Sequence, residues 1–169
     1  PADIARWRAA RDDSHAELLE RGWNDELGAF TQTLDGDRLD ASLLLAPMVK
    51  FVAGDDPRWR STLDAIEERL THGPLVDRYD QAEVDDGFEG DEGSFVMCSF
   101  WFVEALARAG EPERAAELFD RLLTYSGPLG LLSEEIGLDG QLLGNYPQAF
   151  SHLALISAAV ALTERLDGG

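Results

Sequence analysis

Residues 94–109 have the sequence SFVMCSFWFVEALARA, which is apolar around almost the whole circumference of a helix. A helix that is apolar on every side is normally one that other elements bury completely. Residues 40–52 (DASLLLAPMVKFV) and 147–166 (PQAFSHLALISAAVALTERL) share this pattern. The sequence therefore predicts an all-α protein with three inner helices.

Amphipathic segments alternate with these inner segments. Asp56-Pro57 and Glu111-Pro112 each place a proline at the first position of a helix whose apolar residues form one stripe. Residues 3–20 form a further helix of this outer kind, which opens the chain. Because the pairs repeat with a period of about 54 residues, we expect six helices that alternate between an outer and an inner layer.

The connections between the predicted helices differ in length. Links from an inner to the next outer helix are short, whereas the outer-to-inner links cover residues 21–39, 71–93 and 126–146. In an alternating antiparallel array all links of one kind lie at the same end, so the three long connections share one face. Long loops in a compact domain usually carry function, and we expect the functional site on this face. Three hairpins make half of a closed toroid, which predicts that a missing N-terminal half or a second copy covers the open edge.

Composition disfavours several classes of partner and cofactor. A formal net charge of −19 argues against nucleic acid and anionic membranes, and no apolar run approaches the roughly 18 residues that span a bilayer. Cys98 is the only cysteine, and His15, His72 and His152 lack metal-ligand spacing, so we expect no disulfide, no metal and no other cofactor. A single thiol in an apolar stretch favours a reducing compartment, and we expect a cytoplasmic protein.

Two of the long connections contain candidate catalytic and binding residues. Glu134 and Glu135 follow an apolar run and precede a glycine-rich turn, and repulsion between adjacent carboxylates suits one of them to proton transfer. The alternative is an ordinary solvated loop. Arg78 lies among acidic residues, where it either neutralises its neighbours or binds sugar hydroxyls with its planar fork of donors.

Six strings in register resemble the C-terminal half of glycoside hydrolase family 15, the glucoamylases, glucodextranases and related bacterial trehalases. In chain order they are GWNDELGAF, LDASLLLAP, VDRY, EGSFVMCSFWFVEALARAG, GLLSEEI and LGNYPQAFSHLALI. The resemblance covers nearly the whole chain and implies an (α/α)6 barrel, with residues 1–169 as the C-terminal half of the catalytic domain. It also implies an enzyme that inverts anomeric configuration with two carboxyl groups standing roughly 6.5–9.5 Å apart.

The resemblance also implies roles for individual residues. The family's general base follows a serine before the last helix, which falls on Glu134, and Glu135 would line the sugar site beside it. The arginine before tyrosine that binds the glucose at the non-reducing end falls on Arg78. Glu92, where an inner helix opens, and Tyr146, at the start of the last inner helix, are expected to contact the sugar.

The general acid of the family belongs to the N-terminal half, and nothing in this chain corresponds to it. We therefore expect the chain alone to hydrolyse no glycoside at a useful rate. The expected substrate of the complete enzyme is an α-glucoside or oligosaccharide derived from starch, and trehalose hydrolysis is the alternative within the family. Outside the family, the alternative is a non-catalytic helical-repeat module that binds a partner protein through its apolar edge.

Overall fold

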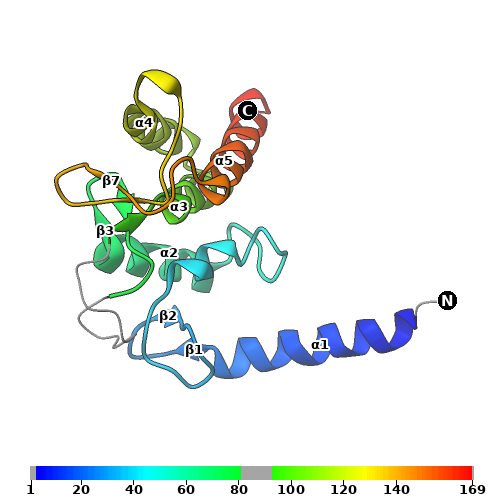
Figure 1. The fold of residues 1–169 in the computed structure, drawn as a ribbon. Coiled ribbons are helices and arrows are strands. Elements are labelled where there is room, and N and C mark those ends of the chain that lie inside the picture. The colour runs from blue at the N-terminus through cyan, green and yellow to red at the C-terminus, as the bar shows by residue number, and fades with distance from the viewer. Residues whose placement is uncertain (1–2, 81–92, 169) are drawn as a thin grey trace.

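The computed structural model describes residues 3–80 and 93–168. Within these residues the framework consists of five α-helices, two short 3₁₀ helices and seven two-residue strands. The α-helices are α1 (Ile4–Arg21), α2 (Pro57–Leu70), α3 (Val96–Arg108), α4 (Pro112–Leu123) and α5 (Ala149–Asp167). Figure 1 shows α3, α4 and α5 gathered at one end of the molecule, with α2 beside them and α1 along the far edge.

The helix α3 forms the centre of the core, as its sequence predicts. It packs mainly against α5 and α4, and it also contacts the 3₁₀ helix η1 (Ala41–Leu45). Ten of its thirteen residues are buried, and Phe100 and Val103 have no exposed surface. Because burial of one such side chain stabilises the fold by about 1.5–3 kcal/mol, α3 holds the surrounding elements in place.

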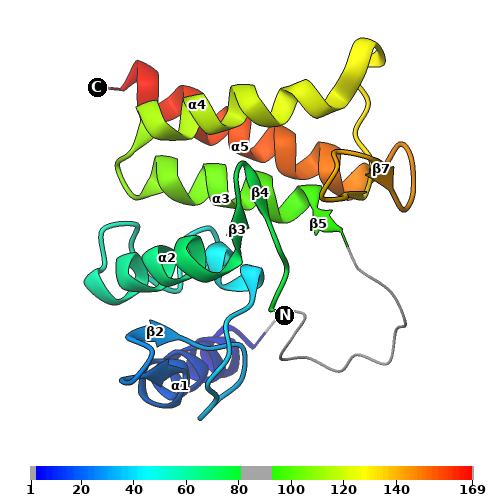
Figure 2. The same cartoon turned by 90° about the vertical axis from the view of Figure 1, so that its left-hand side faces the viewer.

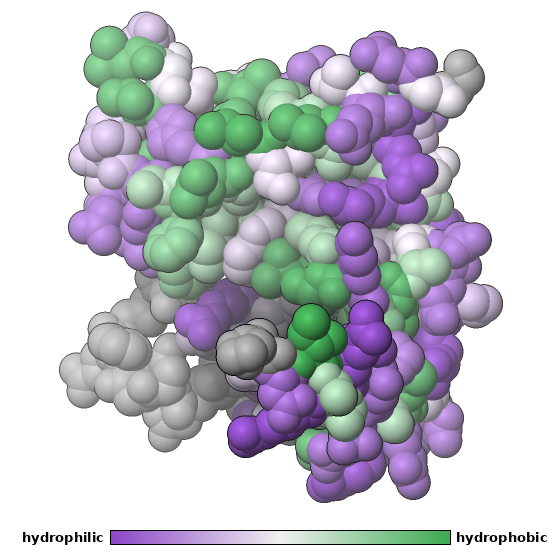
Figure 3. Space-filling view, turned by 90° about the vertical axis from the view of Figure 1, so that its right-hand side faces the viewer, coloured by the Kyte–Doolittle hydropathy of each residue, from purple (hydrophilic) through white to green (hydrophobic). Residues whose placement is uncertain are grey.

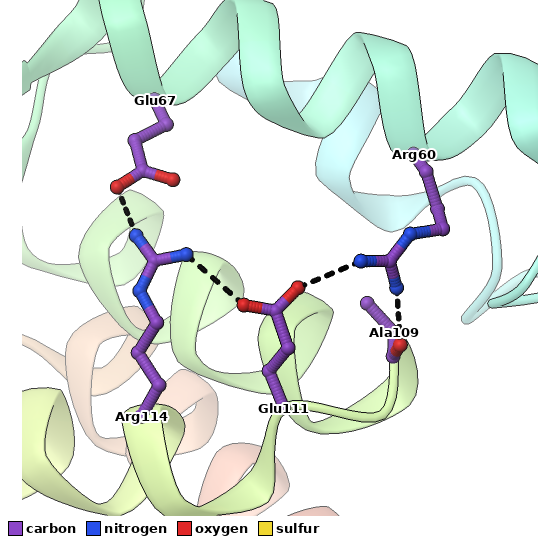
Figure 4. A network of polar contacts seen from close by, with 5 residues as sticks. All are labelled: Arg60, Glu67, Ala109, Glu111 and Arg114. Atoms are coloured by element: carbon purple, nitrogen blue, oxygen red, sulfur yellow. Dashed lines mark hydrogen bonds and ion pairs between the residues drawn. The ribbon is translucent and has the colours of Figure 1, made fainter.

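The outer helices α2 and α4 are joined by a network of charged side chains. Arg60 of α2 lies 2.9 Å from a carboxylate oxygen of Glu111 and also donates to the carbonyl oxygen of Ala109. Arg114 of α4 contacts the other Glu111 oxygen at 3.1 Å and reaches back to Glu67 of α2 (Figure 4). Half-exposed ion pairs stabilise little individually, so the network mainly fixes the position of α4 against α2.

Short antiparallel strands order the three long connections, which the sequence analysis treated as loops. In the first connection β1 (Trp23–Asn24) pairs with β2 (Ala29–Phe30), and in the second β3 (Thr71–His72) pairs with β4 (Leu75–Val76). The third contributes β6 (Glu135–Ile136) and β7 (Leu142–Leu143), and β6 also pairs with β5 (Ser94–Phe95) at the end of the second. The sheet β5-β6-β7 therefore joins two long connections where α3 begins (Figure 2).

The predicted inner helix at residues 40–52 is wrong. Only η1 forms there, with the Asp40 carboxylate accepting a hydrogen bond from the backbone N–H of Ser42 at 2.8 Å. Pro47 explains the break, because proline removes a helical N–H and its ring clashes with the preceding turn. Beyond it the chain turns, and Lys50 adopts a left-handed conformation with a φ of 61°. The described residues therefore contain five α-helices where six were predicted.

The helix α5 forms where it was predicted, but it is not buried on every side. Its small residues face inward, namely Ser151, Ala154, Ala158 and Ala161. Four large apolar residues are more than half exposed and are called the α5 stripe below: Phe150, Leu153, Ile156 and Val160. Figure 3 shows apolar side chains gathered over this part of the surface. Length and composition alone would allow α5 to cross a membrane, but the core helix of a soluble protein meets the same criterion.

Candidate functional site

The three long connections meet near the N-terminal end of α3. The backbone N–H of Ala41 donates to the carbonyl oxygen of Arg78 at 2.7 Å, which joins the first connection to the second. The backbone N–H of Val96, the first residue of α3, donates to the carbonyl oxygen of Glu134 at 3.0 Å. These contacts bring the connections together, as the sequence predicts, and they fix Glu134 to the start of the central helix.

Glu134 immediately precedes β6 and is only partly exposed. Its carboxylate oxygen Oε2 accepts hydrogen bonds from both the backbone N–H and the side-chain Nδ2 of Asn145, each at 2.9 Å. The backbone N–H of Glu134 donates in turn to the Asn145 carbonyl oxygen at 2.9 Å. Within the described part of the chain, Oε1 of Glu134 makes no hydrogen bond and remains able to accept a proton from water.

Glu135 points away from Glu134, because consecutive residues of a strand project to opposite faces. Its Oε2 accepts a hydrogen bond from the backbone N–H of Gly93 at 3.0 Å. The two neighbouring carboxylates thus have different partners, and the expected pairing of the two within one loop is not what the structure contains. Glu135 instead fastens the third connection to the start of β5.

Arg78 has its acidic neighbour in the first connection, not in the acidic run that surrounds it in the sequence. Its Nε lies 4.0 Å from Oδ2 of Asp40, and its guanidinium lies over the ring of Tyr79 at 5.5 Å. Asp40 is almost fully buried and also accepts a hydrogen bond from the side chain of Gln32 at 3.2 Å. The Arg78 side chain remains 52% exposed, so most of its donors can still reach a ligand.

Asp77 organises the second connection and was not identified from the sequence. The hydroxyl of Ser94 donates to Oδ1 of Asp77 at 2.5 Å, and Nε2 of His72 lies 2.7 Å from Oδ2. These contacts hold together the two ends of the segment that contains Arg78. The sequence carries no local signal for them, because Asp77 and Ser94 are brought together only by the strands on either side.

Cys98 lies beneath these charged groups, on the first turn of α3, and has no exposed surface. Burial raises the pKa of its thiol to about 12; the charge of Asp40 adds to the rise, that of Arg78 opposes it, and that of Asp77 adds to it again. The electrostatic influence of all three residues on one thiol indicates that they gather around the N-terminal turn of α3.

The remaining predicted site residues fare differently. Tyr146 follows Asn145 directly and is 46% exposed, so its ring lies close in the chain to the Glu134 carboxylate and is open to solvent. Glu92 lies outside the described residues. His152 accepts a hydrogen bond from the backbone N–H of Leu132 at 3.2 Å, which supports a structural role for this histidine.

A cavity of about 530 Å³ lies beside Asp77 and is lined by His72, Ser94 and the β6–β7 hairpin. None of the predicted site residues lines it, so this cavity is not the space that Glu134 faces. In residues 3–80 and 93–168, no group of three or more His, Cys, Asp or Glu side chains could hold a metal ion.

Comparison with known sequences identifies the family. Residues 1–122 and 111–160 match the sequence model of the family described as Glycosyl hydrolases family 15. A trehalase of Mycolicibacterium smegmatis is 51% identical over 156 residues, which are 92% of this chain and 23% of that protein. A trehalase of Thermoplasma volcanium is 39% identical over 167 residues, 98% of this chain and 26% of that protein. The chain thus spans about a quarter of the length of these curated relatives.

Solved glycosidases share the fold. A wild-type glycosidase matches with a TM-score of 0.80 and 22% identity over 96% of this chain and 45% of its own. A variant glycosidase in complex with glucose matches with a TM-score of 0.78 and 23% identity over the same shares. The family match and the high identity to trehalases over most of the chain show that this protein belongs to glycosyl hydrolase family 15.

Proposed function

We propose that this chain forms part of the catalytic domain of an inverting glycoside hydrolase that acts on trehalose, with Glu134 as the general base. The observation that carries the proposal is the Glu134 carboxylate, held by Asn145 through one oxygen and open at the other, where the long connections meet. The sequence analysis favoured starch-derived oligosaccharides. Trehalose now takes precedence, because relatives at 51% and 39% identity are named trehalases.

Each residue has a defined role in this proposal. Glu134 removes a proton from the water that attacks the anomeric carbon, on the face of the sugar opposite the leaving oxygen. Arg78 donates hydrogen bonds from its exposed guanidinium to sugar hydroxyls. Tyr146, Glu135 and Glu92 contribute to the surroundings of the sugar.

The general acid is supplied by chain outside residues 1–169. The chain covers 45% of the solved glycosidases and a smaller share of the trehalases. We propose that it forms one half of an α/α toroid and that the other half covers the α5 stripe. The isolated chain is then expected to cleave neither trehalose nor maltose, and turnover by the chain alone would contradict this part of the proposal.

The test replaces the matching 156-residue stretch of the M. smegmatis trehalase by the corresponding residues of this chain; the product is called the exchanged enzyme below. We expect it to hydrolyse trehalose and to release one α-glucose and one β-glucose, since inversion changes one anomeric centre. NMR of the anomeric protons at early times distinguishes this from retention, which releases only α-glucose. A folded exchanged enzyme that cleaves maltose and leaves trehalose intact would return the assignment to starch-derived substrates.

The role of Glu134 is tested by Glu134→Gln in the exchanged enzyme. We expect kcat to fall by about 10²–10⁴-fold with little change in KM, because the amide cannot accept the water proton. Glu164→Gln, near the C-terminal end of α5, is the matched control and is expected to leave kcat unchanged. Full activity of Glu134→Gln would exclude Glu134 as the base.

One observation favours a second candidate function. The α5 stripe is an apolar surface that a partner protein could cover, as expected for a non-catalytic helical module. A stable monomer that binds a partner through this stripe, together with an inactive exchanged enzyme, would favour the module.

A further inference from the structure

The turn that follows β7 makes three hydrogen bonds with Glu134. Two donors of Asn145, the backbone N–H and Nδ2, converge on the same carboxylate oxygen, and the Asn145 carbonyl accepts the Glu134 N–H. Hydrogen bonds to an ionised carboxylate are stronger than those between neutral groups and fix its orientation. Because both donors bind Oε2, the lone pairs of Oε1 keep one direction available for a water molecule.

Gly144 is the residue against which the Glu134 side chain packs. A Cβ at this position would lie 2.7 Å from Oε2 of Glu134, 2.8 Å from its Cβ and 3.2 Å from its Cγ. Gly144 also has a φ of 70°, a left-handed conformation that side chains disfavour. The place of the carboxylate therefore depends on the bare backbone of a glycine.

The strand register explains why these residues meet. The pairs Glu135↔Leu143 and Ile136↔Leu142 place Gly144 opposite Glu134 one step further along the ladder. The pair Phe95↔Glu135 likewise places Val96 opposite Glu134 on its other side. Glu134 thus lies between the first residue of α3 and the Gly144-Asn145 turn, so that the sheet positions its carboxylate relative to the central helix.

We infer that Gly144 and Asn145 are positioning residues for the general base: Gly144 provides the space and Asn145 sets the rotation of the Glu134 carboxylate. The inference rests on the proposed function of Glu134. Neither residue need contact the sugar, so their loss affects the chemical step more than substrate binding.

The chain offers a matched control for Gly144. Gly140, in the same β6–β7 hairpin, has a φ of 77°, but the nearest atom to a Cβ there is Cε1 of Tyr125 at 3.8 Å. Alanine at either position meets a similar backbone strain, and only alanine at position 144 reaches Glu134. In the exchanged enzyme we expect Gly144→Ala to lower kcat by about 10- to 100-fold with KM within about twofold, and Gly140→Ala to keep kcat within about twofold.

Substitutions of Asn145 separate hydrogen bonding from packing. Asn145→Ala removes one of the two donors and is expected to lower kcat by about tenfold. Asn145→Asp keeps the shape but places a second carboxylate beside Glu134, so we expect a larger fall than with alanine. A purely structural role would give the opposite order, because the isosteric aspartate would then be the milder change.

The outcomes distinguish the two levels of the argument. Loss of activity in Glu134→Gln, with wild-type kcat in Gly144→Ala and Asn145→Ala, would overturn the positioning inference and leave the proposed function intact. Full activity in Glu134→Gln would overturn the proposed function itself. Equal losses in Gly144→Ala and Gly140→Ala would also refute the inference, since backbone strain alone would explain them.

A measurement on the chain itself does not depend on turnover. The side-chain amide protons of Asn145, followed by ¹H–¹⁵N NMR, are expected to resonate downfield while Nδ2 donates to a carboxylate. Glu134→Gln should move this signal upfield, whereas Glu164→Gln should leave it in place. An Asn145 signal that ignores Glu134→Gln would overturn the inference.

Discussion

Cys98 is buried in the first turn of α3, and its titration couples the stability of the fold to alkaline pH. The thiol of the unfolded chain loses its proton near pH 9, whereas burial raises the pKa in the folded chain to about 12. Between these values the unfolded state releases a proton that the folded state keeps. The free energy of unfolding therefore falls as pH rises through this window, by at most about 1.4 kcal/mol per pH unit, and below pH 9 the thiol contributes no such slope.

The prediction is measured by urea denaturation of the chain and of Cys98→Ala between pH 8 and 11. Other groups titrate in both proteins, so the difference between them isolates the thiol. We expect the advantage of cysteine over alanine to shrink by about 1 kcal/mol between pH 8 and 10. A constant difference would mean that the thiol ionises at the same pH in the folded and unfolded states.

At the residue scale, the sequence located Glu134 and Arg78 but not the residues that hold them. A serine followed by a glutamate, or an arginine before a tyrosine, is visible in a short string. The bonds from Asn145 to Glu134 and from Ser94 to Asp77 depend on strand register. Strands of two residues leave too little alternation in the sequence for that register to be predicted.

Among the elements, α3 and α5 are joined by a buried polar contact. Glu104 of α3 is 2% exposed, bonds Arg108 one turn later at 2.6 Å, and accepts a hydrogen bond from the hydroxyl of Ser157 on α5 at 2.6 Å. A buried carboxylate that loses a donor retains its desolvation cost. We therefore expect Ser157→Ala to lower the free energy of unfolding by about 1–3 kcal/mol, measured by urea denaturation.

Thr163→Ala is the control for this contact. Thr163 lies on the exposed side of the same helix, and its hydroxyl bonds only the carbonyl oxygen of Ala159. We expect it to change stability by less than about 0.5 kcal/mol. Equal effects of the two substitutions would show that Ser157 contributes helix propensity alone.

Helix prediction succeeded where local signals agreed and failed where they conflicted. In α2, Asp56 caps the helix, Pro57 occupies its first position and the apolar stripe has helical spacing. In residues 40–52 the apolar pattern favoured a helix, but Pro47 opposed it, and the proline decided the outcome. The pattern of α5 was read as complete burial, because apolar periodicity does not reveal whether the covering element is present.

For the whole molecule, the α5 stripe makes opposite predictions in two contexts. In the isolated chain it is exposed, so we expect self-association, and Leu153→Gln with Ile156→Gln should yield a monomer by light scattering. In the exchanged enzyme the stripe is expected to be covered, and the same pair should lower Tm because it buries two amides without partners. A rise in Tm there would contradict a half-toroid completed by the rest of the enzyme.

The family could be identified from the sequence, whereas the closure of a toroid and a cytoplasmic location remain predictions. Six strings in register suffice for a family, because they record spacing as well as identity. Closure depends on atoms outside the 169 residues, and a single buried thiol such as Cys98 constrains location only weakly.

The dominance of α5 among the partners of α3 has a consequence during synthesis. On a ribosome, α3 is complete about 60 residues before the end of α5 is made. At roughly 5–20 residues per second, the nascent α3 waits on the order of 3–12 s for the helix that covers it. During that interval its phenylalanines are a target for chaperones and proteases, so the yield of folded protein depends on elongation speed as well as on final stability.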